Sequence, residues 1–144
     1  MPPPRVNAVL PPARRRTRQL RLLTASSNAL ATVAAAHLWG RGHPLAAGTQ
    51  LAITVCGTSM RLCGDAFWTE ALRHHDALAC GANLALAIQA APRIARVRTA
   101  LAMTLLLWPA RYATWTLAGP QTWPDAAVQV ATHVVNAWGW LGWR

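Results

Sequence analysis

Charge is strictly segregated along this chain of 144 residues. Four stretches of 16 to 19 residues contain no Asp, Glu, Lys or Arg, although the formal net charge of the chain is +10. They are 22–40, 42–60, 77–92 and 126–143, and a fifth apolar segment, 99–119, is interrupted only by Arg111. A helix on a water-exposed surface normally carries charge along its outer face, whereas about 20 apolar residues are needed to cross a bilayer. The pattern therefore predicts helices that cross a membrane.

The composition indicates the same class of protein. Charged residues make up 12% of the chain and apolar residues 53%, whereas about a quarter of an ordinary soluble domain is charged. All 14 basic residues are Arg, and eight Trp accompany one Tyr and one Phe. This usage indicates a GC-rich coding sequence, which leaves an unselected or overlapping reading frame as one alternative interpretation.

We predict an all-α fold, a polytopic transmembrane helical bundle that forms one domain over residues 22–144. Four spans are favoured, with five as the alternative, and they lie at about 44–62, 77–92, 98–119 and 125–143. Block 22–40 is the doubtful fifth span because Ser, Asn and His dilute it. Four spans also place the basic N-terminus and the Arg-rich loop at 93–98 on one side of the bilayer, as the positive-inside rule requires.

Residues 61–76 are predicted to form a short amphipathic connector helix at the membrane interface. The segment holds three of the four acidic residues of the protein, at helical spacing against apolar side chains. Its Glu70 and Arg73 are three residues apart and can pair on one helix face. Stripes of small residues in the two flanking blocks predict that these blocks pack together as a hairpin.

The N-terminal segment 1–21 combines five Pro with six Arg and contains no acidic residue. This composition predicts a disordered Arg/Pro-rich tail. Five of its arginines are expected to contact anionic lipid headgroups, at about 1 kcal/mol each near the surface. They are Arg14, Arg15, Arg16, Arg18 and Arg21. We therefore expect an integral membrane protein whose N-terminus lies on the cytoplasmic side, or on the matrix or stromal side of an organelle.

Membrane anchors are predicted near the ends of the later blocks. Arg111 lies near enough to the end of its segment for its side chain to reach the interface. Trp138, Trp140 and Trp143 close the last block, where an aromatic belt would place them. An ionisable residue inside an apolar segment is a functional candidate in general, but its position near a helix end favours an anchor.

Two sets of residues are weak candidates for metal chemistry. The first carries thiolate and imidazole ligands at one end of two predicted helices, with a spacing that matches no standard zinc module, and comprises Cys63, His74, His75 and Cys80. The second comprises His37 and His133, the two histidines within apolar blocks, as axial ligands of a haem between helices. Packed or hydrogen-bonded side chains are the simpler interpretation of both sets, so we expect no metal and no cofactor.

The sequence offers no nucleophilic motif, phosphate-binding loop or carboxylate pair, and we predict that the protein is not an enzyme. The predicted function is that of a membrane assembly or accessory subunit, or of an oligomeric pore-type component, which associates through helix–helix contacts with itself or with other membrane subunits. The alternative from a different class is a soluble basic helical protein that binds nucleic acid. We disfavour this partner because six of the 14 Arg gather in the N-terminal segment instead of along the helix faces.

Overall fold

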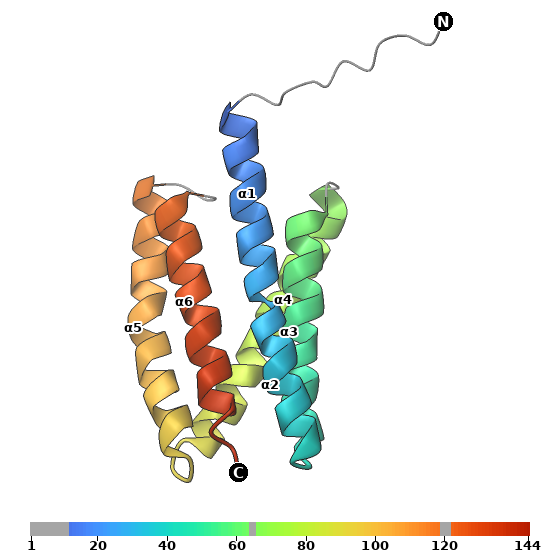
Figure 1. Ribbon diagram of the computed structural model, residues 1–144, viewed down its shortest axis with the longest axis vertical. Helices are drawn as coiled ribbons and strands as arrows, with labels where there is room; N and C mark the ends of the chain where they lie inside the picture. The colour runs from blue at the N-terminus through green and yellow to red at the C-terminus, as the bar shows by residue number, and fades with distance from the viewer. Residues whose placement is uncertain (1–11, 64–65, 119–121) are drawn as a thin grey trace, which may run out of the picture.

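The computed structural model describes residues 12–63, 66–118 and 122–144, and these residues form six helices and no strand. The helices are α1 (Pro12–Ser27), α2 (Ala29–Gly40), α3 (Pro44–Leu62), α4 (Ala66–Ala90), α5 (Ala95–Ala118) and α6 (Trp123–Trp140), shown in Figure 1. The all-α content predicted from the sequence is therefore confirmed for the described part of the chain.

Helices α1 and α2 follow one another along a single bent column (Figure 1). Only Asn28 separates them, and its side chain is 1% exposed. In α1, Thr24 Oγ1 donates to the carbonyl of Leu20 at 2.9 Å, and Ser27 Oγ donates to the carbonyl of Thr24 at 2.8 Å. Hydroxyl groups that bond back to the preceding turn tend to bend a helix. They favour the break at Asn28.

A tight turn separates α2 from α3. Gly42 adopts φ +79°, a left-handed conformation that costs glycine little because it has no Cβ. Pro44 then occupies the first turn of α3, where its missing N–H is not needed. Helix α3 covers the same residues as the predicted block at 44–62.

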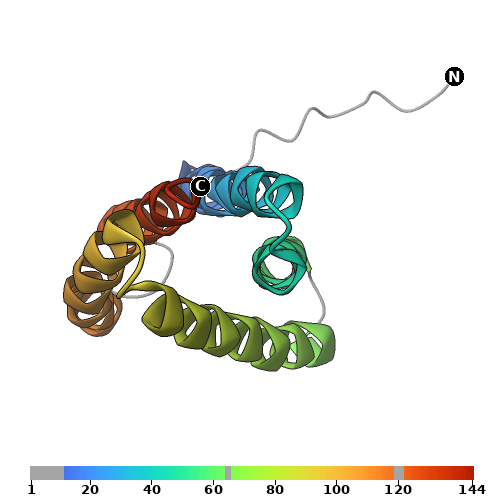
Figure 2. The ribbon, with the colours of Figure 1, turned by 90° about the horizontal axis from the view of Figure 1, so that it is seen from below.

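The helices form a ring around a common centre (Figure 2). Helix α3 packs against both α2 and α4, α4 contacts α5, α5 pairs with α6, and α6 closes the ring against α1 and α2. The hairpin predicted between the second and third apolar blocks is thus present in α3 and α4. Its apolar contacts include Ile53 and Ala79, whereas Gly48 and Gly81 of the predicted small-residue stripes are exposed.

The apolar core lies at the end of the ring that holds the C-terminus. Most of its members are alanines, whose small side chains let the helix backbones approach closely, and its largest member is Trp140. The approach of α6 to α5 is especially close, because a Cβ on Gly139 would lie 2.6 Å from the Cβ of Ala100. Glycine is therefore the residue that fits at position 139 without a shift of the two helices.

The prediction of membrane-spanning helices is wrong. Among the described residues, none of the helices combines the length and the apolar character that a crossing of the bilayer requires. Helix α2 has only 12 residues, and the apolar blocks of α3 and α6 are diluted by amide side chains such as Gln50, Gln129 and Asn136. The same finding overturns the four-span and five-span bundles, the integral membrane localisation, and the function as a membrane subunit or pore.

Two predicted boundaries also differ from the structure. Most of the predicted connector 61–76 belongs to α4, which runs without a break into the third apolar block. The ion pair expected there is confirmed, with Arg73 Nη1 lying 3.1 Å from Glu70 Oε2. At the N-terminus, α1 begins at Pro12, so part of the predicted tail is helical. Proline is tolerated in the first turn, and the Arg, Gln and Leu residues that follow it are good helix formers.

Candidate functional site

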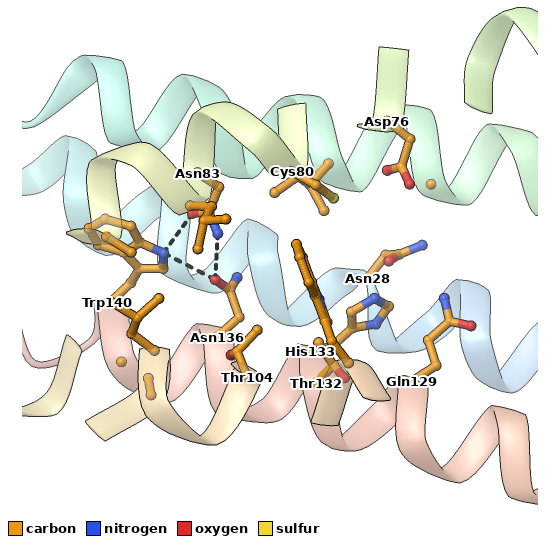
Figure 3. Close-up of a pocket in the computed structure, with 18 of the residues that line it drawn as sticks. Asn28, Asp76, Cys80, Asn83, Thr104, Gln129, Thr132, His133, Asn136 and Trp140 are labelled. Carbon is orange, nitrogen blue, oxygen red and sulfur yellow. Dashed lines mark hydrogen bonds between the residues drawn. The ribbon is translucent and has the colours of Figure 1, made fainter. Parts of the chain in front are cut away.

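A cavity of about 130 Å³ lies inside the ring. Helices α3, α4, α5 and α6 line it, together with Asn28 at the junction of α1 and α2 (Figure 3). Helices α4 and α6 each contribute a stripe of polar side chains whose members are three or four residues apart, which places them on one helix face. The stripe of α4 comprises Asp76, Cys80 and Asn83, and that of α6 comprises Gln129, His133, Asn136 and Trp140.

At one end of the cavity, three amide side chains bond to one another in a closed circuit. Gln50 Nε2 donates to Asn83 Oδ1, Asn83 Nδ2 donates to Asn136 Oδ1 at 2.9 Å, and Asn136 Nδ2 donates to Gln50 Oε1 at 2.8 Å. The indole N–H of Trp140 adds a bond of 2.8 Å to Asn83 Oδ1 (Figure 3). We refer to these four residues as the amide circuit. Every member has partners within the protein, which is what buried polar groups require.

The other end of the cavity contains charged side chains, Arg61 of α3, Asp76 of α4 and Arg111 of α5. Among the described residues, the ion pairs shorter than 4.0 Å found for Glu70 are with Arg73 and His74, and Asp76 has no such pair with either cavity arginine. Burial raises the pKa of Asp76, and the two arginines oppose this shift. We refer to this region, together with Gln129, as the charged end.

Arg61 is held from one side only. Its Nη1 donates to Thr24 Oγ1 of α1 at 3.1 Å, whereas its Nε is buried and has no hydrogen-bond partner. Burial lowers the pKa of Arg61 to about 10, and repulsion from Arg111 acts in the same direction. Asp125 and Asp76 oppose the shift. The guanidinium therefore stays protonated at neutral pH, and its buried Nε–H has no acceptor.

Gln129 supplies a second unused polar atom at the charged end. Its side chain is 3% exposed, and its Oε1 is buried without a hydrogen-bond partner. Figure 3 shows Gln129 at the same end of the cavity as Asp76 and Asn28, opposite Trp140. A buried amide oxygen without a donor costs about 1–3 kcal/mol, so a donor placed beside this atom would stabilise the protein.

His133 is uncharged in this environment. Burial lowers its pKa to about 4, with further repulsion from Arg61 and Arg111. One ring nitrogen, Nδ1, lies 2.6 Å from Ser27 Oγ. At neutral pH the imidazole is therefore a hydrogen-bonding group that carries no charge and binds protons weakly.

The cavity cysteine is also uncharged at neutral pH. Burial, with a smaller contribution from Asp76, raises the pKa of Cys80 to about 12. Desolvation likewise raises the pKa of Cys56 on the neighbouring helix. Because the thiolate is the nucleophilic form, a thiol with so high a pKa contributes little to catalysis at neutral pH.

The residues proposed as metal ligands do not meet at one point. Cys80 lines the cavity, whereas His74 and His75 are exposed and their Nδ1 atoms lie 2.8 Å from the carbonyl oxygens of Glu70 and Ala71. Cys63 lies just after α3. The described residues include no group of three or more His, Cys, Asp and Glu side chains that could hold a metal ion.

The two haem candidates have protein partners. His37 Nε2 lies 2.7 Å from the carbonyl oxygen of Trp143, and His133 Nδ1 is bonded to Ser27. Both contacts tie the last helix and the C-terminal residues to the column of α1 and α2. These bonds give each histidine a structural role that needs no cofactor.

The predicted membrane anchors have other positions. Arg111 lines the cavity instead of reaching outward. Trp140 is 2% exposed and stacks on Trp143 with 5.4 Å between ring centroids. Only Trp138 is clearly exposed, and the guanidinium of Arg96 lies 5.8 Å from its ring centroid. For the lipid-headgroup candidates, Arg18 and Arg21 are exposed on α1, and the side chains of Arg14, Arg15 and Arg16 lie outside the described part of the structure.

The sequence analysis missed the amide side chains of the cavity. The signal was their spacing, since Gln129, His133, Asn136 and Trp140 follow one another at steps of four, three and four residues. Asp76, Cys80 and Asn83 repeat the first two steps. Two apolar segments that each carry a polar stripe of helical period can place both stripes against a common interior.

Comparisons of the chain with protein-family profiles, with curated proteins and with solved structures find no match.

Proposed function

We propose that the protein binds a small organic molecule in the central cavity. The observation that carries this proposal is the pair of unused polar atoms at the charged end, Arg61 Nε and Gln129 Oε1, both buried and without partners. Buried polar atoms are nearly always paired in folded proteins, and the exceptions often mark a ligand or a water that completes the site. A ligand that offers one acceptor and one donor would satisfy both atoms.

Binding is favoured over catalysis by the protonation states around the cavity. His133, with a pKa of about 4, and Cys80, with a pKa of about 12, are both uncharged at neutral pH. Effective acid–base groups have pKa values near the working pH, and an effective cysteine nucleophile must be a thiolate. The absence of catalysis stays a prediction, as it is from the sequence.

The test is ligand-observed ¹⁹F NMR with a set of fluorobenzenes that carry an alcohol, an amide, an amine or a carboxylate. Ala87 lines the cavity and Ala85 is exposed on the same helix, so Ala87→Phe fills the cavity and Ala85→Phe is the matched control. Thr104→Phe fills it from α5. Thermal melts verify that the variants fold.

We expect at least one probe to bind the native protein and the Ala85→Phe variant in a saturable manner. Binding should be lost in the folded variant that fills the cavity. If no probe binds the native protein, or if both cavity-filling variants bind as well as the control, the proposed function is wrong.

A second candidate function, nucleic-acid binding, is favoured by the start of α1. Figure 1 shows this end of α1 extending beyond the ends of its neighbours, and the helix carries five Arg between positions 14 and 21. A helix that binds along a bilayer surface needs an apolar face. Leu20, the one large apolar residue between positions 14 and 21, is 2% exposed, and the exposed apolar surface of α1 begins only after the cluster, at Leu22 and Leu23. Phosphate groups of nucleic acid need no apolar face.

The test for nucleic acid measures the binding of a fluorescent duplex and of a single strand between 50 and 200 mM salt. Changing Arg14, Arg15 and Arg16 to Gln should reduce the slope of log K against log salt by about 0.7–0.9 for each lost phosphate contact. The matched control changes Arg93, Arg96 and Arg98, which lie toward the other end of the bundle. Binding to anionic vesicles in preference to both nucleic acids would overturn this candidate and favour lipid headgroups.

A further inference from the structure

We propose that the cavity ligand is a small monocyclic organic acid whose carboxylate binds at Arg61 and Arg111 and whose ring carries a hydroxyl group that donates to Gln129. This inference rests on the proposed binding function and specifies the chemistry of its ligand. It follows from the charges that line the cavity, from the unused hydrogen-bonding atoms, and from the size and apolar lining of the space.

The charged side chains of the cavity favour an anionic ligand. Two guanidinium groups and one carboxylate line the cavity, and each arginine lies close enough to depress the pKa of Asp76. Each also acts on His133, and Arg111 acts on Arg61. Two cations that repel each other in a poorly hydrated site are stabilised by an anion placed between them. Asp76 does not fill this role, since it makes no ion pair within 4.0 Å with either.

The two unpartnered atoms require both an acceptor and a donor from the ligand. The unused Nε–H of Arg61 is a donor, so it needs an acceptor such as a carboxylate oxygen. The unused Oε1 of Gln129 is an acceptor, so it needs a donor. A carboxylate alone satisfies the first atom and not the second. The hydroxyl group follows from this second requirement.

The volume and the apolar lining of the cavity favour a ligand with a single ring. An engineered protein cavity of about 150 Å³ holds one benzene molecule, and the cavity here measures about 130 Å³. Apolar side chains form part of its lining, among them Ile53, Leu101 and Trp108. A single ring with one or two small substituents fits these dimensions, whereas a nucleotide does not.

The experiment titrates benzoate, its neutral isostere benzamide and the three hydroxybenzoate isomers into the full-length protein by isothermal titration calorimetry. The variants are Arg61→Gln, Arg111→Gln and Arg111→Lys, with Arg98→Gln as the control on the exposed surface of α5. Gln129→Met tests the hydroxyl contact. Because Arg61 is partly buried and bonded to Thr24, Arg111→Gln provides the charge test if Arg61→Gln fails to fold.

We expect benzoate to bind at least about 10-fold more tightly than benzamide, as hydrogen bonds to charged groups imply. Arg111→Gln should remove this preference, whereas Arg111→Lys and Arg98→Gln should retain it. One hydroxybenzoate isomer should bind more tightly than benzoate, and Gln129→Met should abolish that gain alone.

The outcomes separate the two proposals. If benzamide binds as tightly as benzoate, the acidic ligand is wrong and the binding function stands. If the acid preference is present and no hydroxybenzoate isomer gains affinity, the hydroxyl contact is wrong. If none of the probes binds and the ¹⁹F screen is also empty, the binding function itself fails.

Discussion

The two ends of the central cavity differ in whether their buried polar groups have hydrogen-bond partners. At the amide circuit, Gln50, Asn83 and Asn136 bond to one another, and Trp140 adds a fourth donor. At the charged end, Arg61 and Gln129 each keep a buried atom without a partner. The side chains of the amide circuit therefore satisfy one another, whereas two polar atoms of the charged end have no partner.

The difference separates polar groups that specify the fold from polar groups that are available to a ligand. A satisfied network fixes the relative positions of the helices that contribute to it, here α3, α4 and α6. An unsatisfied group destabilises the protein, and a ligand that pairs with it would remove that cost. Removing a polar group should therefore have opposite effects on stability at the two ends.

The largest effect is expected at the amide circuit. Asn83→Leu leaves a Gln50 N–H without its acceptor, removes the donor to Asn136 Oδ1, and leaves the Trp140 N–H with only its longer bond of 3.2 Å to Asn136 Oδ1. The free energy of unfolding should therefore fall by about 3 kcal/mol. Urea denaturation measures it. The control is Gln89→Leu, at an exposed position of the same helix, where a change within about 0.5 kcal/mol is expected. Equal effects at the two positions would show that the circuit contributes little.

A second effect is the pH dependence of stability that arises from His133, whose protonation Arg61 and Arg111 of the charged end oppose. The pKa of His133 is about 4 in the folded protein and about 6.5 when unfolded, so between these values the unfolded chain binds more protons. The contribution of His133 is therefore complete above pH 6.5 and is lost as the pH falls toward 4, by about 3 kcal/mol. Asp76, whose pKa is raised, acts in the opposite sense near the acid end of this window.

The measurement for His133 is the difference in unfolding free energy between the native protein and His133→Gln across pH 4 to 7. The difference should depend on pH, because only the native protein loses the contribution of a neutral His133. Gln89→Leu, at an exposed position without a titratable group, serves as the control and should leave the pH profile unchanged. A pH-independent difference for His133→Gln would contradict the assignment of a buried, neutral imidazole.

A smaller effect on stability is expected where α5 and α6 are in close contact, at Gly139. Gly139→Ala places a methyl group 2.6 Å from the Cβ of Ala100, and such overpacking should cost about 2 kcal/mol. Gly81→Ala, on α4, meets no atom within 4 Å and should stabilise the helix by about 0.5–1 kcal/mol. Thermal melts of the two variants should therefore move in opposite directions. An unchanged or raised melting temperature of Gly139→Ala would mean that α5 and α6 are not in close contact.

The smallest effect has the opposite sign to the first. Gln129→Leu removes the unpartnered acceptor and keeps most of the side-chain volume, so the ligand-free protein should gain about 1 kcal/mol. Urea denaturation without ligand provides the measurement. A loss of stability would show that Gln129 supports the fold in the manner of Asn83.

The positions of the helices are easier to predict from this sequence than the environment, lipid or protein interior, that each helix faces. Pro44 and the Gly-containing turn before it mark the start of α3 in the sequence and in the structure alike. The membrane prediction is wrong because an uncharged segment can still be polar: Gln50, Asn136 and Gln129 make those blocks polar on the side that faces the interior. A count of charges does not distinguish an amide that faces a cavity from an apolar side chain that faces lipid.

The candidate site was predictable only in part. Arg111 stood out as the one charge within an apolar segment, yet its position near the helix end favoured an anchor. Its role depends on Arg61, which is 50 residues away in the sequence and sits in the predicted connector. Local periodicity identifies a polar stripe, but which stripes face one another depends on the order of helices around the ring, and that is a long-range property of packing.

The bond between Arg61 and Thr24 has a thermodynamic consequence for the two candidate functions. Thr24 belongs to α1, the helix whose beginning carries the arginine cluster, so one side chain contacts both the cavity and that helix. A cavity ligand that reorients Arg61 would alter the helix that presents the cluster. By reciprocity, a polyanion bound at the start of α1 must then change the affinity of the cavity by the same factor as the cavity ligand changes the affinity for the polyanion.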